Sequence, residues 1–480
     1  MKYLFIACLS FCVYAGGHAQ SHPGKVRKIE PCACPVEVDS SFHSLCAYLL
    51  VPENRKKDNG KIIRLPFIIV KSNNPSKKKD PYLYTTGGPG GSSLRWVRGA
   101  VKSSVIHYRD CIAFEQRGTH FALPNLWSNE LSDAIKEAYR NNLNKDSMVL
   151  EGTRRYKIAL EAKGIDLSGY NTDETVSDII DLLLTLQIDS VNLAGGSYSG
   201  GLMLAVLQKD PSLVRSLVLD SPLPTFIPID EDEPANFNEA LSILFEHAAK
   251  DSTDKSIYSG LQLRFKDYFT SIEGKTFYIS YLEKGAARPI NIGYTRNELF
   301  DIIGGLLGNP GRLKDAPGII NNPITGKHEP YVREMFDDIF NHDVGPSGMR
   351  ISVYCADQTA YHREDVLSEI VNAYPYMKGY HINDVYKAMC DCWQVPPIDK
   401  KTKQPFYSQK PVLIADGEMD YACRPLYMDL IHHYMPNSQR ILSTSRTHMV
   451  GGAAMDEYTM QFLDNPFKKL VSTQRDMVIY

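Results

Sequence analysis

The chain has 480 residues, of which 43% are hydrophobic and 23% charged, and its 53 basic residues nearly balance its 56 acidic ones. A formal net charge of −3 is too small to attract phosphate polymers, so the composition argues against a nucleic-acid partner. The length is about three times that of a common domain. It allows one large α/β unit with an insertion, or two ordinary domains.

The N-terminus has the features of a secretory signal peptide. Lys2 precedes an apolar run over 3–14, and Gly17 and Ala19 then provide the small residues that a signal peptidase reads. The run is shorter than the roughly 20 residues of a membrane-spanning helix. We therefore expect a signal peptide at 1–19 and a mature chain that is exported to the periplasm or beyond, without a stable membrane anchor.

Cysteine usage agrees with export. Removal of the signal peptide leaves eight of the ten cysteines, and an even number in an exported chain favours disulfides. Cys32 and Cys34 precede Cys46, and Cys390 and Cys392 follow Cys355, so a local bridge is expected in each group, while the pairing stays open. The Cys-x-Cys spacings are narrower than those of usual zinc sites, and we expect neither a metal nor another cofactor.

Apolar runs separated by turn residues predict strands in the first half of the chain, at 47–51, 62–70, 82–84 and 111–114. N-capping residues at 171–174 then introduce apolar positions at helical spacing, which predicts a helix with one buried face. A strand at 190–194, a helix at 202–208 and a strand at 216–220 follow. This alternation predicts an α/β fold, with a mostly parallel sheet and helices on both faces.

The pattern changes after Pro222. Pro, Asp and Glu crowd the following residues, and irregular helical patterns continue to about Lys410 before strands return at 411–415 and 439–442. We interpret the intervening region as a largely helical cap over the carboxyl edge of the sheet. The predicted division is a first core part at 20–221, a cap region with the start of the C-terminal part at 222–410, and the last core strands at 411–480.

A serine lies between small residues where a predicted strand turns into a helix. Such a strained turn presents a nucleophile, and the residues two positions before and after it must be small because strand and helix approach closely. Ser197 has Gly195 and Ser199 at these positions, whereas a frame centred on Ser199 has Ser197 and Gly201. We prefer Ser197 because its frame begins where the apolar strand ends.

A glycine-rich loop at 86–91 directly follows the strand at 82–84. In an acyl-transfer enzyme of this architecture, a loop at this place supplies a backbone N–H to the oxyanion. We expect the oxyanion to be held by the amides of Gly88 and Tyr198.

The remaining members of a catalytic triad should follow in the order acid, then histidine, each after a late strand. The loop after 411–415 contains Asp416, Glu418 and Asp420, of which we prefer Asp420 because it lies deepest in the loop. His448 follows the strand at 439–442. In the predicted mechanism Ser197 attacks a carbonyl, His448 transfers the proton, and Asp420 orients the imidazole.

These motifs resemble those of the secreted bacterial tripeptidyl aminopeptidases and the related proline iminopeptidases, which are α/β hydrolases. The resemblance extends over most of the mature chain. Its segments are Thr86–Gly90, similar to HGGPG; Glu115–Thr119, similar to DQRG(T/S); Gly195–Tyr198 with Asp220–Pro222; Cys355–Asp357 with Cys392–Trp393; and Gly417–Asp420 with Arg424–Pro425.

The resemblance implies an exopeptidase that removes one or a few residues from a peptide with a free N-terminus, held through its ammonium group by acidic residues of the cap. Glu231, Glu233, Glu239 and Glu246 lie near the start of the cap, and no motif selects one of them. The alternative interpretation is a carboxylic-ester hydrolase that uses the same triad. An inactive scaffold protein is disfavoured, because no triad residue is missing.

Overall fold

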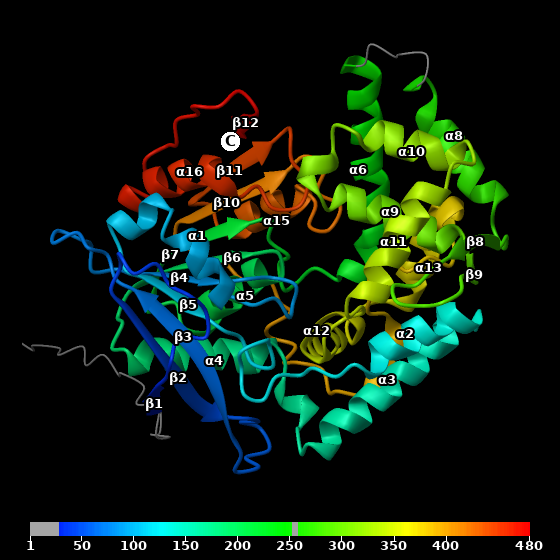
Figure 1. Ribbon diagram of the computed structural model, residues 1–480. Helices are drawn as coiled ribbons and strands as arrows, with labels where there is room; N and C mark the ends of the chain where they lie inside the picture. Colours follow the sequence, from blue (N-terminus) through cyan, green and yellow to red (C-terminus); the bar gives the residue numbers. More distant parts are fainter. Residues whose placement is uncertain (1–27, 252–257) are drawn as a thin grey trace, which may run out of the picture.

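The computed structural model describes residues 28–251 and 258–480, so the predicted signal peptide at 1–19 lies outside the described residues. A ten-stranded sheet forms one half of the molecule, on the left in Figure 1. Its strands are β1 (Lys28–Pro31), β2 (Ser44–Pro52), β3 (Ile62–Val70), β4 (Tyr82–Thr85), β5 (Cys111–Phe114), β6 (Val191–Gly196), β7 (Val214–Asp220), β10 (Val412–Gly417), β11 (Ser438–Ser443) and β12 (Met477–Ile479).

The strand order is β1-β2-β3-β5-β4-β6-β7-β10-β11-β12. The six strands from β5 to β11 in this order are parallel, and the strands at both edges are antiparallel. The predicted α/β fold with a mostly parallel sheet is confirmed. Parallel strands end at the same edge of the sheet, which brings together the loops after β4, β6, β7, β10 and β11.

Helices cover both faces of the sheet. Apolar side chains of α4 (Thr172–Thr185), α5 (Tyr198–Lys209) and α15 (Leu426–Tyr434) pack on one face, and those of α1 (Val97–Ala100) and α16 (Gly452–Asp464) pack on the other. The first turn of α4 is capped by Asn171, whose side chain accepts a hydrogen bond from the Glu174 amide at 3.0 Å. With both faces covered, β5, β6 and β10 are buried along their whole length.

The cap begins with α6 (Ile229–Asp251) and lies beside the sheet (Figure 1). It has a separate aromatic core, to which Tyr139 also belongs. Its other elements are α8 (Leu261–Ser271), β8 (Phe277–Tyr281), β9 (Ile290–Tyr294), α9 (Arg296–Leu307), α10 (Ala316–Ile324) and α11 (Glu329–Asn341), next to α2 (Glu130–Asn141) and α3 (Lys145–Ala162). Strands β8 and β9 form an antiparallel hairpin that the helical pattern did not predict.

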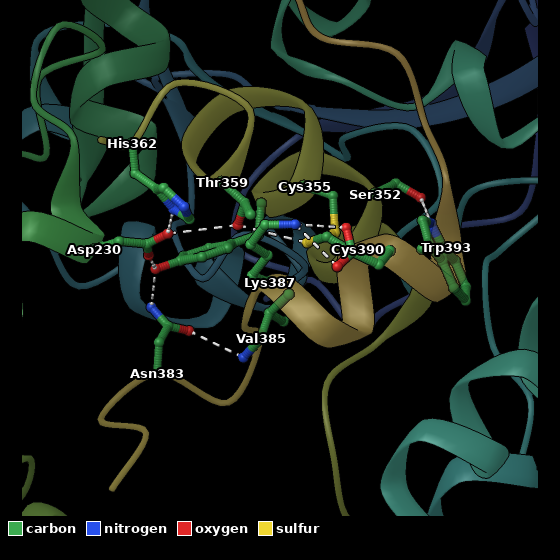
Figure 2. Close-up of a disulfide and its surroundings, with 12 residues drawn as sticks. Asp230, Ser352, Cys355, Thr359, His362, Asn383, Val385, Lys387, Cys390 and Trp393 are labelled. Carbon is green, nitrogen blue, oxygen red and sulfur yellow. Dashed lines mark hydrogen bonds and ion pairs between the residues drawn. A yellow bond between two sulfur atoms is a disulfide. The ribbon is translucent and has the colours of Figure 1, made fainter. Parts of the chain in front are cut away.

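The chain returns from the cap through α12 (Gly348–Tyr354), a π-helical turn (Cys355–Thr359), α13 (Glu364–Ala373) and α14 (Lys387–Trp393). Disulfides join Cys34 to Cys46 and Cys355 to Cys390, so each predicted group contains one bridge. The second bridge ties α14 to the turn after α12 (Figure 2). In the described part of the chain, no helix is long and apolar enough to cross a membrane.

Candidate active site

Ser197 forms the sharp turn between β6 and α5. Its φ of 55° lies in the left-handed region, which is strained for a residue with a side chain. The turn is held by the Ser197 amide, which donates to the Asp220 carbonyl at 3.0 Å, and by the Ser197 carbonyl, which accepts from the Leu223 amide at 3.0 Å. A Cβ on Gly195 would lie 2.5 Å from the Ser199 carbonyl oxygen, so a glycine is required there.

Ser199, the alternative nucleophile, is fully buried below the glycine-rich loop. Its hydroxyl donates to the Thr86 carbonyl and accepts from Gln116 Nε2 at 3.0 Å and from Thr85 Oγ1 at 3.1 Å. The Gln116 amide also donates to the Thr86 carbonyl at 2.7 Å. Ser199 therefore supports the loop, whereas Ser197 borders a pocket.

His448 and Asp420 are hydrogen-bonded, with 2.7 Å between Nδ1 and Oδ2. The second oxygen of Asp420 accepts from the amides of Ala422 and Cys423, both at 2.8 Å. Burial alone would lower the pKa of His448, but the Asp420 carboxylate raises it above its ordinary value. Burial opposes the ionisation of Asp420, yet the charge of His448 holds the pKa of Asp420 below its usual range.

The nucleophile and the base are not hydrogen-bonded to each other in the described part of the chain. The polar neighbour of Ser197 Oγ is the Cys423 thiol at 4.0 Å. Catalytic hydrogen bonds between a nucleophile and its base are often long in an enzyme without substrate. The elements that carry Ser197 and His448 nevertheless meet at one edge of the sheet.

Asp220 joins the two halves of this site and was missed as a site residue in the sequence. Its backbone carbonyl holds the Ser197 turn, while its carboxylate accepts from the amides of Val450 at 2.8 Å and Gly451 at 2.9 Å. It therefore ties the loop that carries His448 to the nucleophile turn. The signal for this role is its position at the end of β7, the strand next to β6.

The glycine-rich loop passes against the nucleophile turn. A Cβ on Gly87 would lie 2.8 Å from the Ser197 Cβ, so the loop approaches as closely as a backbone without side chains allows. Gly88 and Tyr198, the two expected oxyanion donors, both line the pocket that contains Ser197. The Arg350 guanidinium donates to the Gly88 carbonyl and thereby holds the loop from the cap side.

The pocket has a volume of about 290 Å³ and lies between the core and the returning cap segments. Three carboxyl groups, those of Glu233, Asp357 and Asp384, line it together with Ser197, and that of Asp384 pairs with Arg350 at 2.6 Å. Of the four acidic candidates from the sequence, Glu233 alone lines this pocket. The other three bind elsewhere: Glu231 accepts from the Arg363 amide, Glu239 pairs with Arg424, and Glu246 pairs with Lys250.

Glu233 lies in a hydrogen-bonded cluster that Figure 2 shows in part, around Asp230, His362 and Asn383. Its Oε1 accepts from Asn383 Nδ2 at 2.7 Å and from the Tyr354 hydroxyl at 3.3 Å, and Tyr354 also donates to Asp230. Burial, followed by the negative charge of Asp230, raises the pKa of Glu233 to about 8.

Asp357 follows Cys355 in the disulfide-bonded turn and is 5% exposed. One of its oxygens accepts from the Thr172 hydroxyl, while Oδ1 is buried and has no hydrogen-bond partner within the described residues. Burial raises the pKa of Asp357 to about 7. The motif Cys355–Asp357 was visible in the sequence, but nothing local indicated that Asp357 lines the pocket that contains Ser197.

No group of three or more His, Cys, Asp or Glu side chains in 28–251 and 258–480 is arranged to hold a metal ion. The site itself offers a serine hydroxyl, an imidazole paired with a carboxylate, and backbone amides. Such a set is suited to acyl transfer.

Comparison with known proteins agrees with this fold. Residues 83–307 match the family described as "alpha/beta hydrolase fold", and residues 374–469 match the family described as "TAP-like protein". The chain is an α/β hydrolase. Its C-terminal part, which contains the Asp420 and His448 loops, is TAP-like. A search of curated proteins gives no match.

Solved structures with similarity to this chain include peptidases, esterases and epoxide hydrolases. A proline iminopeptidase from Mycobacterium smegmatis is 14% identical, with 88% of this chain and 98% of that chain covered and a TM-score of 0.39. An esterase from Exiguobacterium antarcticum is 12% identical, with coverages of 85% and 96% and a TM-score of 0.35. A mutant epoxide hydrolase from Bacillus megaterium is 12% identical, with coverages of 84% and 95% and a TM-score of 0.35.

Proposed function

We propose that the chain is an exported serine exopeptidase that releases an N-terminal residue or short peptide from peptides with a free N-terminus. The observation that carries this proposal is that two carboxyl groups, that of the partly buried Glu233 and that of the buried Asp357, line the pocket that contains Ser197. A pocket for a plain ester has no use for two acids, whereas a peptide N-terminus offers them an ammonium group.

The electrostatics of the pocket support an ammonium ligand. Burial raises the pKa of Glu233 and Asp357 because water no longer solvates their ionised forms. A cation bound between them would replace that solvation and favour both carboxylates. Because the carboxyl groups are fixed relative to Ser197, the anchored ammonium would set how many residues precede the bond that is cleaved.

In the proposed mechanism, Ser197 Oγ attacks the carbonyl carbon of the scissile amide while His448 takes the hydroxyl proton. The charge that develops on the carbonyl oxygen would be stabilised by the amides of Gly88 and Tyr198. His448 then donates the proton to the leaving nitrogen, and the ester on Ser197 is hydrolysed by water in a second, equivalent cycle. Asp420 holds the imidazole and stabilises its charged form.

The test compares chromogenic aminoacyl and tripeptidyl amides, each with a free and an acetylated N-terminus, beside p-nitrophenyl esters. Wild type should cleave the free-amine amides and leave the acetylated ones intact, and Ser197→Ala should abolish turnover, since loss of a triad serine costs on the order of 10⁶ in kcat. Equal cleavage of acetylated amides would exclude the exopeptidase. Ester cleavage without amide cleavage would leave the carboxylic-ester hydrolase.

Export is the second part of the proposal. The apolar run at 3–14 and the disulfides at Cys34–Cys46 and Cys355–Cys390 support it, because disulfides persist in oxidising compartments. The mass of the protein recovered after expression in a bacterium should correspond to a chain that begins at Gln20. A full-length mass in the cytoplasmic fraction would contradict export.

A further inference from the structure

A second carboxyl group lies against the acid of the proposed triad. Asp416, the penultimate residue of β10, is fully buried, and its carboxyl group lies close enough to that of Asp420 for the two to interact electrostatically. Both residues were candidates for the triad acid in the sequence. The structure pairs Asp420 with His448, which leaves Asp416 without an assigned role.

The hydrogen bonds of the two groups differ. Both oxygens of Asp420 are occupied, one by His448 and one by two backbone amides. Asp416 Oδ1 accepts from the Gly417 amide at 2.8 Å and from the Ser221 hydroxyl at 3.1 Å. Asp416 Oδ2 is buried, and no donor reaches it within the described residues. An ionised carboxylate would leave this oxygen with an uncompensated charge.

Two carboxyl groups in contact inside a protein do not both ionise, because each charge opposes the other and neither is solvated. The one that keeps its proton is the one with fewer donors. We propose that Asp416 remains protonated, and that it donates a hydrogen bond from Oδ2 to the carboxylate of Asp420. Asp416 is then a positioning residue, which fixes the triad acid without touching the substrate.

The neighbouring groups agree with this assignment. Burial, followed by the negative charge of Asp420, raises the pKa of Asp416 well above its ordinary value. The other titratable groups that interact with Asp420 include His448, Asp220, the buried thiol of Cys423 and the Tyr421 hydroxyl, and of these His448 forms the charged pair with Asp420. Of the two acids, Asp416 is therefore the protonated one and Asp420 the ionised one.

Asp416 also contacts the loop of the base. The Ser221 hydroxyl, which donates to Asp416, accepts from the Met449 amide at 2.9 Å. Met449 directly follows His448. Loss of the Asp416 side chain would therefore release Asp420 on one side and the His448 loop on the other.

The inference rests on the proposed triad, and its test uses p-nitrophenyl acetate, which a peptidase and an esterase of this mechanism both hydrolyse. Asp416→Asn retains an acceptor for Ser221 and a donor for Asp420, so its kcat should stay within about 3-fold of wild type. Asp416→Ala removes both hydrogen bonds and should lower kcat about 10- to 100-fold with little change in KM. Ser443→Ala is the matched control, because Ser443 lies opposite Gly417 on β11 and its buried hydroxyl has no partner in the described chain.

A second measurement does not depend on turnover. NMR titration of the His448 imidazole should give a higher pKa in Asp416→Ala than in wild type, because Asp420 loses a donor and its charge concentrates toward His448. Asp416→Asn and Ser443→Ala should titrate like wild type. A role in folding alone would lower the melting temperature without moving this pKa.

The outcomes separate this inference from the proposed function. A kcat as low in Asp416→Asn as in Asp416→Ala would mean that Asp416 acts as a carboxylate, and would overturn the inference. An unchanged kcat and His448 pKa in Asp416→Ala would also overturn it. If Ser197→Ala retained ester turnover while the His448 pKa rose in Asp416→Ala as expected, the proposed triad would be wrong. The assignment of the proton to Asp416 would still be supported.

Discussion

The Ser199 hydroxyl is the side chain by which this molecule joins its nucleophile turn to its glycine-rich loop. It bonds both the Thr86 carbonyl and the Gln116 amide, and all three groups are buried or partly buried. Ser199→Ala should lower kcat for amide substrates about 10-fold with little change in KM, because the loop loses a hydrogen bond that fixes Gly88. Steady-state kinetics on a free-amine p-nitroanilide would measure this.

Ser177→Ala provides the control for Ser199→Ala. The Ser177 hydroxyl donates to the Asp173 carbonyl one turn earlier in α4, away from the loop, at 2.9 Å. This variant should keep the wild-type kcat. A Ser199→Ala enzyme with an unchanged kcat and a raised KM would show that the hydroxyl acts in substrate binding instead.

The raised pKa values of Glu233 and Asp357 determine how activity should depend on pH. Their carboxyls bind an ammonium group only when ionised, so kcat/KM for a free-amine amide should rise with pH through about 7 to 8. Above this range it should fall, because an α-amino group loses its proton with a pKa near about 8. A pH–rate profile should show this optimum for an aminoacyl p-nitroanilide, and p-nitrophenyl acetate should lack the carboxyl-dependent limb.

Substitution of Glu233 tests whether this carboxyl group is responsible for the rise of kcat/KM with pH. Glu233→Gln should lower kcat/KM for free-amine amides about 10- to 100-fold and leave acetate ester hydrolysis nearly unchanged, since the lost interaction is a charge-assisted hydrogen bond. Glu239→Gln, on the same helix but paired with Arg424, should behave like wild type. Equal losses for both substrates in Glu233→Gln would place Glu233 in the structural support of the pocket.

At the scale of single residues, local patterns were sufficient for groups that follow a strand directly. Ser197, Gly88 and His448 each follow a predicted strand, and a parallel sheet necessarily brings such loops to one edge. Asp220 and Asp357 could not be assigned in this way. Their carboxyl groups bond residues far away in the sequence, Val450 for Asp220 across 230 positions and Thr172 for Asp357 across 185, and no short motif encodes such contacts.

At the scale of elements, the predicted strands agree with the structure within a few residues, because buried parallel strands are nearly continuous apolar runs. The helix after Ser197 was placed at 202–208, but α5 begins at Tyr198. Glycines obscured its first turn, since glycine has a low helix propensity. The structure requires them: a Cβ on Gly200 or Gly201 would lie 2.5 Å from the Pro222 Cβ or 2.1 Å from the Leu223 carbonyl oxygen.

The disulfide Cys355–Cys390 holds α14 against the turn that carries Asp357, across 35 residues of sequence. Replacement of both cysteines by serine should lower the free energy of unfolding by about 3–4 kcal/mol, according to the loop-entropy relation. Denaturant unfolding would measure the loss. Cys392→Ser is the control, because Cys392 lies on the same helix and is not bridged. An equal loss in the control would mean that side-chain volume, and not the covalent link, stabilises this region.

At the scale of the whole molecule, a buried ion network connects segments from three parts of the core. Arg117, after β5, pairs with Asp178 of α4 at 2.7 Å, and neither side chain is exposed. Arg55, after β2, pairs with Asp178 at 2.7 Å and with Glu174 at 2.6 Å. Because Arg117 follows Gln116, the network also fixes the segment that supports the glycine-rich loop.

Removal of one member of such a network leaves buried charges without a partner. Asp178→Ala should therefore lower the free energy of unfolding by about 3–5 kcal/mol, a large part of the ~5–15 kcal/mol that stabilises a typical protein. Glu329→Ala, which breaks the exposed pair with Arg333 on α11, should cost about 0.3–0.5 kcal/mol.

The double variant Arg117→Met/Asp178→Leu tests two explanations. Either the ion pair itself stabilises the fold, or the fold is destabilised only when one buried charge loses its partner. Apolar side chains of similar volume often replace a buried ion pair without loss, because the desolvation of both charges is avoided. Arg55 would keep Glu174 and Asp181 as partners. The double variant should therefore be more stable than Asp178→Ala in denaturant unfolding. If it is less stable, the hydrogen bonds of Arg117 to the Glu53 and Gly169 carbonyls hold the core together more than the ion pair does.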